Sequence, residues 1–123
     1  MGANGSFAKG ATNKEENRHW KTIGSIGENI KILQMKNPKA PLKLPEESHT
    51  PNRIYAIFKK NGSDVKCIAQ YDSNGKKIWE IHTDDHYGLK PHFHYWKNGG
   101  QEEDAHPLIQ VQLDLLNTVR NFK

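Results

Sequence analysis

Alternating apolar and polar residues in the middle of the chain predict three short β-strands joined by tight turns. Residues 53–58 and 65–71 alternate and are rich in β-branched and aromatic side chains, and the Asn-Gly pair at 61–62 is typical of a hairpin. A second turn at residues 72–75 leads to a third strand over residues 77–82. Short consecutive strands of this kind indicate an antiparallel meander.

Toward the C-terminus the apolar spacing changes from that of a strand to that of a helix. Residues 92–96 alternate as a fourth strand, whereas residues 107–122 repeat their apolar side chains at helical intervals. Pro107 suits a first helical turn, with Asp104 or His106 near the cap. The predicted fold class is therefore α+β, a small antiparallel β-meander packed against a C-terminal helix. The predicted buried face of the helix consists of Leu108, Val111, Leu115, Leu116, Val119 and Phe122.

The N-terminal half has a weaker pattern. Residues 1–18, rich in small and polar side chains, predict a flexible arm, and residues 19–123 predict a single domain. Residues 29–35 read as a short strand, while residues 20–26 combine a helical spacing of apolar side chains with a glycine that disfavours a long helix. Four prolines make residues 37–51 an extended connector.

Charge and composition narrow the class of protein. The 123 residues carry a net charge of +4, with acidic and basic residues interspersed. A lone cysteine, Cys67, allows neither an intramolecular disulfide nor a thiolate zinc site and is interpreted as a strand residue. Neither a membrane span nor a signal core is apparent, so the protein is expected in the cytoplasm. Direct nucleic-acid binding has little support, because the basic residues at the turns form no continuous stripe: Lys59, Lys60, Lys76 and Lys77.

The candidate chemistry lies in a histidine-rich segment between the third and fourth strands. Four of the seven histidines fall between residues 82 and 94, and side chains two apart on extended chain share a face. Gly88 and Pro91 would reverse the chain between the two groups. Imidazole is the commonest zinc ligand and carboxylate an accepted companion, although nickel or iron also suits imidazole. The predicted ligands of one metal ion, preferably zinc, are His82, Asp84, His86, His92 and His94.

Two questions about this metal site stay open in the sequence. Asp85 or His106 would serve in place of Asp84 as the completing ligand. The surplus of ligands favours a closed, structural site and a protein that is not an enzyme. A metal-dependent hydrolase is the alternative, with Glu80 or Asp85 as base and a lysine, Lys90 or Lys97, as the stabilising charge, although no known hydrolase motif is present. Residues 19–123 are accordingly expected to form one α+β metal-binding domain.

Three segments resemble a family of small proteins encoded by phages and prophages of Gram-positive bacteria. They are MGANGSF at residues 1–7, KNPKAPLKLPEESHTPNRIYA at 36–56 and KIWEIHTD at 77–84. The family includes zinc-containing type II anti-CRISPR proteins, which inhibit Cas9. The resemblance implies an inhibitor that occupies the surface of a host defence protein, most naturally Cas9, in the cytoplasm of the infected cell, with zinc as a structural ion.

The histidine-rich segment also resembles a polymorphic-toxin domain in which an Asp-His pair precedes a His-x-His element. Asp85-His86 and His92-Phe93-His94 match that pattern over about thirty residues. This second resemblance implies a metal-dependent nuclease or toxin-like hydrolase. A minor virion or assembly protein is a third interpretation. The sequence does not fix an oligomeric state.

Overall fold

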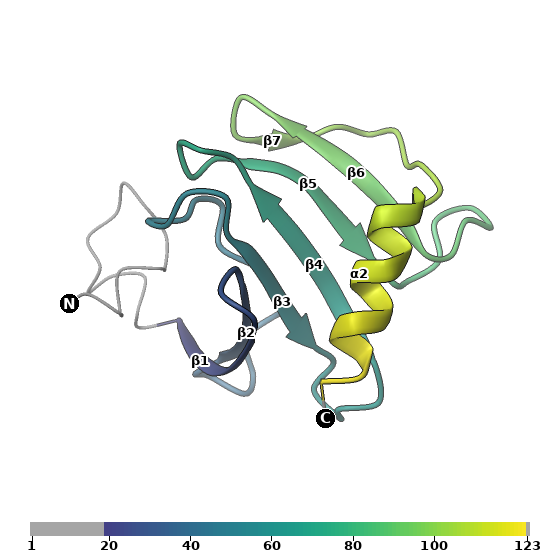
Figure 1. The fold of residues 1–123 in the computed structure, drawn as a ribbon. Helices are drawn as coiled ribbons and strands as arrows, with labels where there is room; N and C mark the ends of the chain where they lie inside the picture. Colours follow the sequence, from purple (N-terminus) through teal and green to yellow (C-terminus); the bar gives the residue numbers. More distant parts are fainter. Residues whose placement is uncertain (1–18, 123) are drawn as a thin grey trace.

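The computed structural model describes residues 19–122, which form a seven-stranded sheet with a helix against one face (Figure 1). The strands lie in the sheet in their order along the chain, and every neighbouring pair is antiparallel except β2 and β3. The α+β class is therefore confirmed. The elements are β1 (Trp20–Ile26), β2 (Ile30–Met35), β3 (Ile54–Phe58), β4 (Val65–Tyr71), β5 (Lys77–His82), β6 (His92–Lys97), β7 (Gly100–Gln101) and α2 (Gln110–Arg120).

The predicted meander corresponds to β3, β4, β5 and β6. Each pairs antiparallel with the next, and the strand bounds agree with the alternating segments of the sequence to within a residue or two. The predicted N-terminal arm, residues 1–18, lies outside the described residues. Within residues 19–122, no helix combines the length and the apolar character needed to cross a bilayer.

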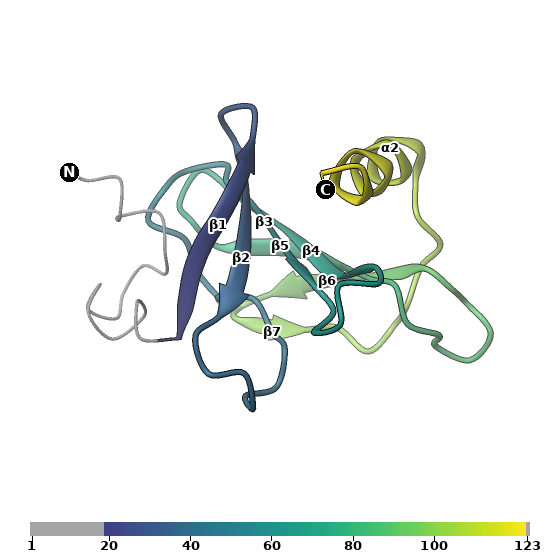
Figure 2. The ribbon, with the colours of Figure 1, turned by 90° about the horizontal axis from the view of Figure 1, so that it is seen from below.

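The first two strands form a hairpin that pairs with β3 and is steeply inclined to the later strands of the meander (Figure 2). Residues 20–26 are a strand and not a helix, and the chain reverses at Gly27, whose φ of 60° suits glycine. Trp20 is buried, and its indole N–H donates to the carbonyl of Lys43 at 2.9 Å. The expectation of a purely antiparallel sheet is wrong at β2–β3, because the long proline-rich connector lets the chain return to the same edge in the same direction.

Helix α2 covers the face of the sheet that carries the second half of the apolar core. It begins at Gln110, later than predicted, and buries Leu116 and Val119. The prediction that Val111 is buried is wrong, since its side chain is 65% exposed. Gln112 takes that place because it lies four residues before Leu116, and its Oε1 accepts a hydrogen bond at 3.0 Å from the N–H of the N-cap residue.

The two faces of strands β5 and β6 have different character. Ile81 and Phe93 are cross-strand partners and pack in the core beneath α2. The residues next to Ile81 and Phe93 along each strand point to the opposite face, because side chains alternate along a strand. That opposite face is where His82, His92 and His94 lie, at the far end of the sheet from the β1–β2 hairpin.

Candidate metal centre

The pairing register of β5 and β6 brings three of the predicted histidines onto one face of the sheet. His82 and His92 are cross-strand partners, and such partners project side by side. His94 is two residues beyond His92 on the same strand and therefore points the same way. His92 and His94 are both buried, at 4% and 3% exposure.

The loop between the strands adds His86 to this group through a tight turn. His86 and Leu89 exchange two backbone hydrogen bonds of 3.0 Å each, and the two residues between them have positive φ, 51° at Tyr87 and 88° at Gly88. Positive φ at both central positions is the geometry of a type I′ turn. The Asp85 carboxylate accepts a hydrogen bond of 3.1 Å from the Gly88 N–H. The turn thus directs His86 back toward β6.

The imidazoles of His86, His92 and His94 converge closely enough to hold a metal ion. One ring nitrogen of each lies within 4.8 Å of the others. The ring centroids are 5.1 Å apart for His92–His94, 5.2 Å for His86–His92 and 5.3 Å for His86–His94. Ligand nitrogens about 2.0–2.1 Å from a tetrahedral zinc are roughly 3.4 Å from one another, so modest ring rotations would complete the geometry.

Hydrogen bonding around these rings fits a metal centre. His94 Nδ1 lies 2.9 Å from the carbonyl oxygen of Glu102; because a carbonyl only accepts, this contact places the proton on Nδ1 and leaves Nε2 for a metal. Among the described residues, His92 Nδ1 and His82 Nε2 are buried without a hydrogen-bond partner. An unsatisfied buried polar atom costs about 1–3 kcal/mol, and a coordinated ion is one way to remove that cost.

His82 lies next to the three converging histidines and has a buried carboxylate behind it. Its ring stacks on His92, with centroids 5.4 Å apart and planes 16° apart. His82 Nε2 is 3.8 Å from Glu80 Oε2, too far for a hydrogen bond but close enough for electrostatic attraction. Glu80 in turn bonds the buried Lys77 ammonium at 2.8 Å, and that ammonium lies 4.0 Å from the Trp96 ring centroid.

The position of Glu80 and Lys77 beside the histidines was not predicted from the sequence. The sequence suggests Glu80 only as a hydrolytic base. The signal that could have found it is alternation, because Glu80 is two residues before His82 on the same strand and is the cross-strand partner of His94.

The surroundings keep two of the rings in the form that binds metals. Burial lowers the pKa of His82, and the nearby Glu80 carboxylate opposes this effect only in part. Burial also lowers the pKa of His92, reinforced by the neighbouring His94. A lowered pKa favours neutral imidazole, which is the form that coordinates a metal.

Asp84 and His106 lie outside the three-histidine group. The Asp84 carboxylate is hydrogen-bonded to Lys66, which lowers its pKa, and it lies 3.8 Å from Lys59. The backbone of His106 pairs with Phe93, so its ring shares the face beneath α2 and packs 5.2 Å from the Phe93 ring. Of the predicted ligands and their alternatives, the structure groups His86, His92 and His94 and places His82 beside them.

No protein-family model, curated protein or solved structure matches this chain. The case for a metal centre therefore depends on the geometry and chemistry of the chain's own residues.

Proposed function

We propose that this chain is a zinc-binding protein in which the ion joins the β5–β6 loop to the two strands and has a structural role. The convergence of His86, His92 and His94 is the observation that carries the proposal. Imidazole nitrogens are preferred zinc ligands, and three of them form the larger part of a tetrahedral shell. Metal binding at such a site contributes directly to folding, which matters for a loop whose tip, Tyr87, is 97% exposed.

His82 is the proposed fourth ligand of a closed zinc site. It stacks on His92, and its Nε2 is buried without a hydrogen-bond partner in the described part of the chain. The Glu80 carboxylate, whose Oε2 lies 3.8 Å from this same nitrogen, would place negative charge close to the bound ion. Four protein ligands leave no position for a reactive water, so the proposed role of the ion is structural.

The proposed biological role is inhibition of a host defence protein, with Cas9 as the first partner to test. Its support is the resemblance of residues 1–7, 36–56 and 77–84 to anti-CRISPR proteins of phages and prophages. The protein would then act in the cytoplasm of the infected bacterium and would not be an enzyme. The zinc ion would stabilise the folded domain and leave its outer surface to contact the partner.

Elemental analysis of the purified protein tests the metal proposal. We expect one zinc ion per chain, and we expect His92→Ala combined with His94→Ala to lose it. His19→Ala is the matched control, because His19 is an exposed histidine away from the site. Protein that is stripped with a chelator and then offered zinc, nickel and iron should recover zinc in preference. If no metal remains at stoichiometric amounts and none rebinds, the proposal is wrong.

A DNA-cleavage assay tests the partner. Excess purified protein is added to Cas9 already loaded with guide RNA, and target cleavage and target binding are both measured. We expect target cleavage to fall as the concentration of the protein rises. Target binding would fall with it if the protein blocks loading, and would stay unchanged if the protein blocks cleavage alone. Unchanged cleavage at saturating protein would remove Cas9 as the partner while leaving the zinc proposal intact.

A metal-dependent nuclease is the second candidate, because the three converging histidines would leave one coordination position open if His82 does not bind. In that case His82 and Glu80 would serve in proton transfer beside a metal-bound water. His82→Ala separates the candidates. A structural site should lose zinc affinity in this variant, whereas a catalytic site should keep its zinc and lose activity. RNA and DNA that stay intact with and without a chelator would exclude the nuclease.

A further inference from the structure

A groove opens where strands β2 and β3 separate, far along the sheet from the histidines. The two strands pair in parallel only as far as Leu33 and Ile57. Beyond that point β2 continues beside β1, while β3 turns into the β3–β4 hairpin. The resulting cavity has a volume of about 450 Å³, within the range of roughly 300–1,000 Å³ that ligand sites occupy.

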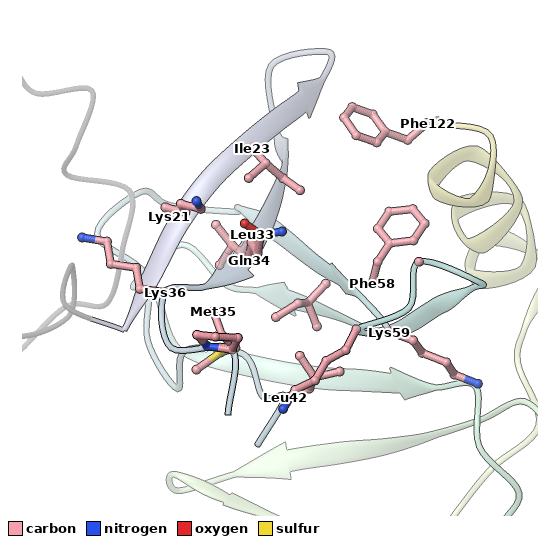
Figure 3. Close-up of a pocket in the computed structure, with 14 residues that line it drawn as sticks. Lys21, Ile23, Leu33, Gln34, Met35, Lys36, Leu42, Phe58, Lys59 and Phe122 are labelled. Atoms are coloured by element: carbon pink, nitrogen blue, oxygen red, sulfur yellow. The ribbon is translucent and has the colours of Figure 1, made fainter. Parts of the chain in front are cut away.

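The floor of this groove is apolar. Phe58 and Phe122 lie beside each other, with ring centroids 6.4 Å apart, and Ile23 faces the groove from β1 (Figure 3). Ile23 is 46% exposed, so its side chain is accessible to a molecule in the groove. The apolar lining residues include Ile23, Leu33, Met35, Leu42, Phe58 and Phe122.

Positive charge lies on both sides of the apolar floor. Lys21 and Lys36 line one wall and Lys59 lines the other (Figure 3), and Lys60, next to Lys59 in the sequence, also lines the groove. None of the lining residues is acidic. Within residues 19–122, Lys59 is the member of this set with an ion pair, at 3.8 Å from Asp84.

We propose that this groove binds an extended acidic segment of a partner protein, with an aromatic or long aliphatic side chain on the Phe58–Phe122 floor and carboxylates against the lysines of both walls. A long-chain fatty acid would match only one wall, because it carries its single carboxylate at one end. Charge complementarity of this kind governs partner choice and association rate. The inference rests on the proposed function only in treating the chain as a protein-binding protein, and it does not involve the metal.

Fluorescence anisotropy with a defined probe tests the proposal on the full chain. The probe is a fluorescein-labelled peptide with a central leucine–phenylalanine pair flanked on both sides by glutamates. We expect saturable binding that weakens as salt is raised. Lys36→Glu combined with Lys60→Glu should weaken it about tenfold or more, and Ile23→Ser should weaken it by a similar factor. Lys43→Glu is the matched control, because Lys43 is exposed and does not line the groove.

Several outcomes would overturn the proposal. These are no binding of the peptide, equal binding of a peptide whose glutamates are replaced by lysines, and an equal loss with Lys43→Glu. Binding of dodecanoate but not the peptide would assign the groove to a lipid-like anion, and a dimer that Ile23→Ser dissociates would assign it to a second copy. His92→Ala with His94→Ala should leave peptide binding unchanged once the variant is shown to be folded, so failure of the groove and failure of the metal site are distinguishable.

Discussion

The two faces of strands β5 and β6 bury their side chains by different means. On one face Ile81 and Phe93 are covered by α2, and the contacts there are apolar. On the other face the buried His92 and His94 and the half-buried His82 lie beside a charged pair, Lys77–Glu80, and no helix of the described chain lies over them. The same two strands thus present an ordinary core on one side and a cluster of polar rings on the other.

The two faces differ in what the burial of their side chains requires. An apolar face gains free energy in proportion to the area removed from water, without further requirements. Burying an imidazole costs free energy for each nitrogen left unsatisfied, and two of these nitrogens lack hydrogen-bond partners among residues 19–122. The histidine face is therefore expected to depend on a ligand for its stability, whereas the face beneath α2 is not.

Removing the metal site should give the largest change. We expect His92→Ala with His94→Ala to lower the free energy of unfolding by about 4 kcal/mol when free zinc exceeds its dissociation constant a thousandfold, because ligand stabilisation grows with that ratio. Urea unfolding with zinc and with a chelator measures this. With the chelator most of the difference should disappear. A difference of equal size under both conditions would mean that the rings stabilise by packing alone.

The face beneath α2 should lose stability to the same extent with and without zinc when its packing is disrupted. Leu116→Ala removes a fully buried side chain from the contact between α2 and the sheet. We expect a loss of about 3 kcal/mol, with and without zinc alike, from the lost transfer free energy and the cavity left behind. Zinc content, measured on the same sample, should stay at the wild-type value. Loss of zinc in this variant would show that the two faces are not independent.

Acid should weaken the metal-free protein through the histidine face. Because the pKa values of His82 and His92 are lowered below the ordinary 6.5, the unfolded chain binds protons first as the pH falls. Stability contributed by these neutral rings is present above about pH 6.5 and is lost as the pH falls from there toward their folded pKa values. Urea unfolding in chelator at a series of pH values measures the slope. His82→Gln with His92→Gln should flatten the dependence of the unfolding free energy on pH. An unchanged dependence would assign it to other titrating groups.

The smallest effect on stability is expected for Asp84, whose carboxylate lies beside Lys66 and Lys59. The Asp84 side chain is 46% exposed, so Asp84→Asn should cost about 0.5 kcal/mol and change zinc affinity less than about twofold. His86→Ala serves as the comparison, because loss of a ligand should weaken zinc binding far more. Competition with a zinc-sensitive dye measures both. A large loss of affinity in Asp84→Asn would place this carboxylate among the ligands after all.

Local pattern decided much of this molecule. Alternation and turn residues predicted the β3–β6 meander, and the same period of two predicted that His92 and His94 share a face and that His82 lies on the strand beside them. The helix was predictable from its spacing, although its first turn was not, since Gln112 and not Val111 occupies the buried position. These features depend on interactions between residues that are close in sequence or in adjacent strands.

Tertiary structure decided the rest, because those features depend on residues distant in sequence. The parallel pairing of β2 with β3 follows from where a long connector returns, and local periodicity carries no information about that. Asp84 satisfies the alternation rule for a ligand, yet it pairs instead with Lys66 of β4 and Lys59, which directly follows β3. His106 faces away because its backbone pairs with Phe93. The residue types available to bind a metal are evident from the chain alone, whereas the packing of separate strands selects the ones that meet.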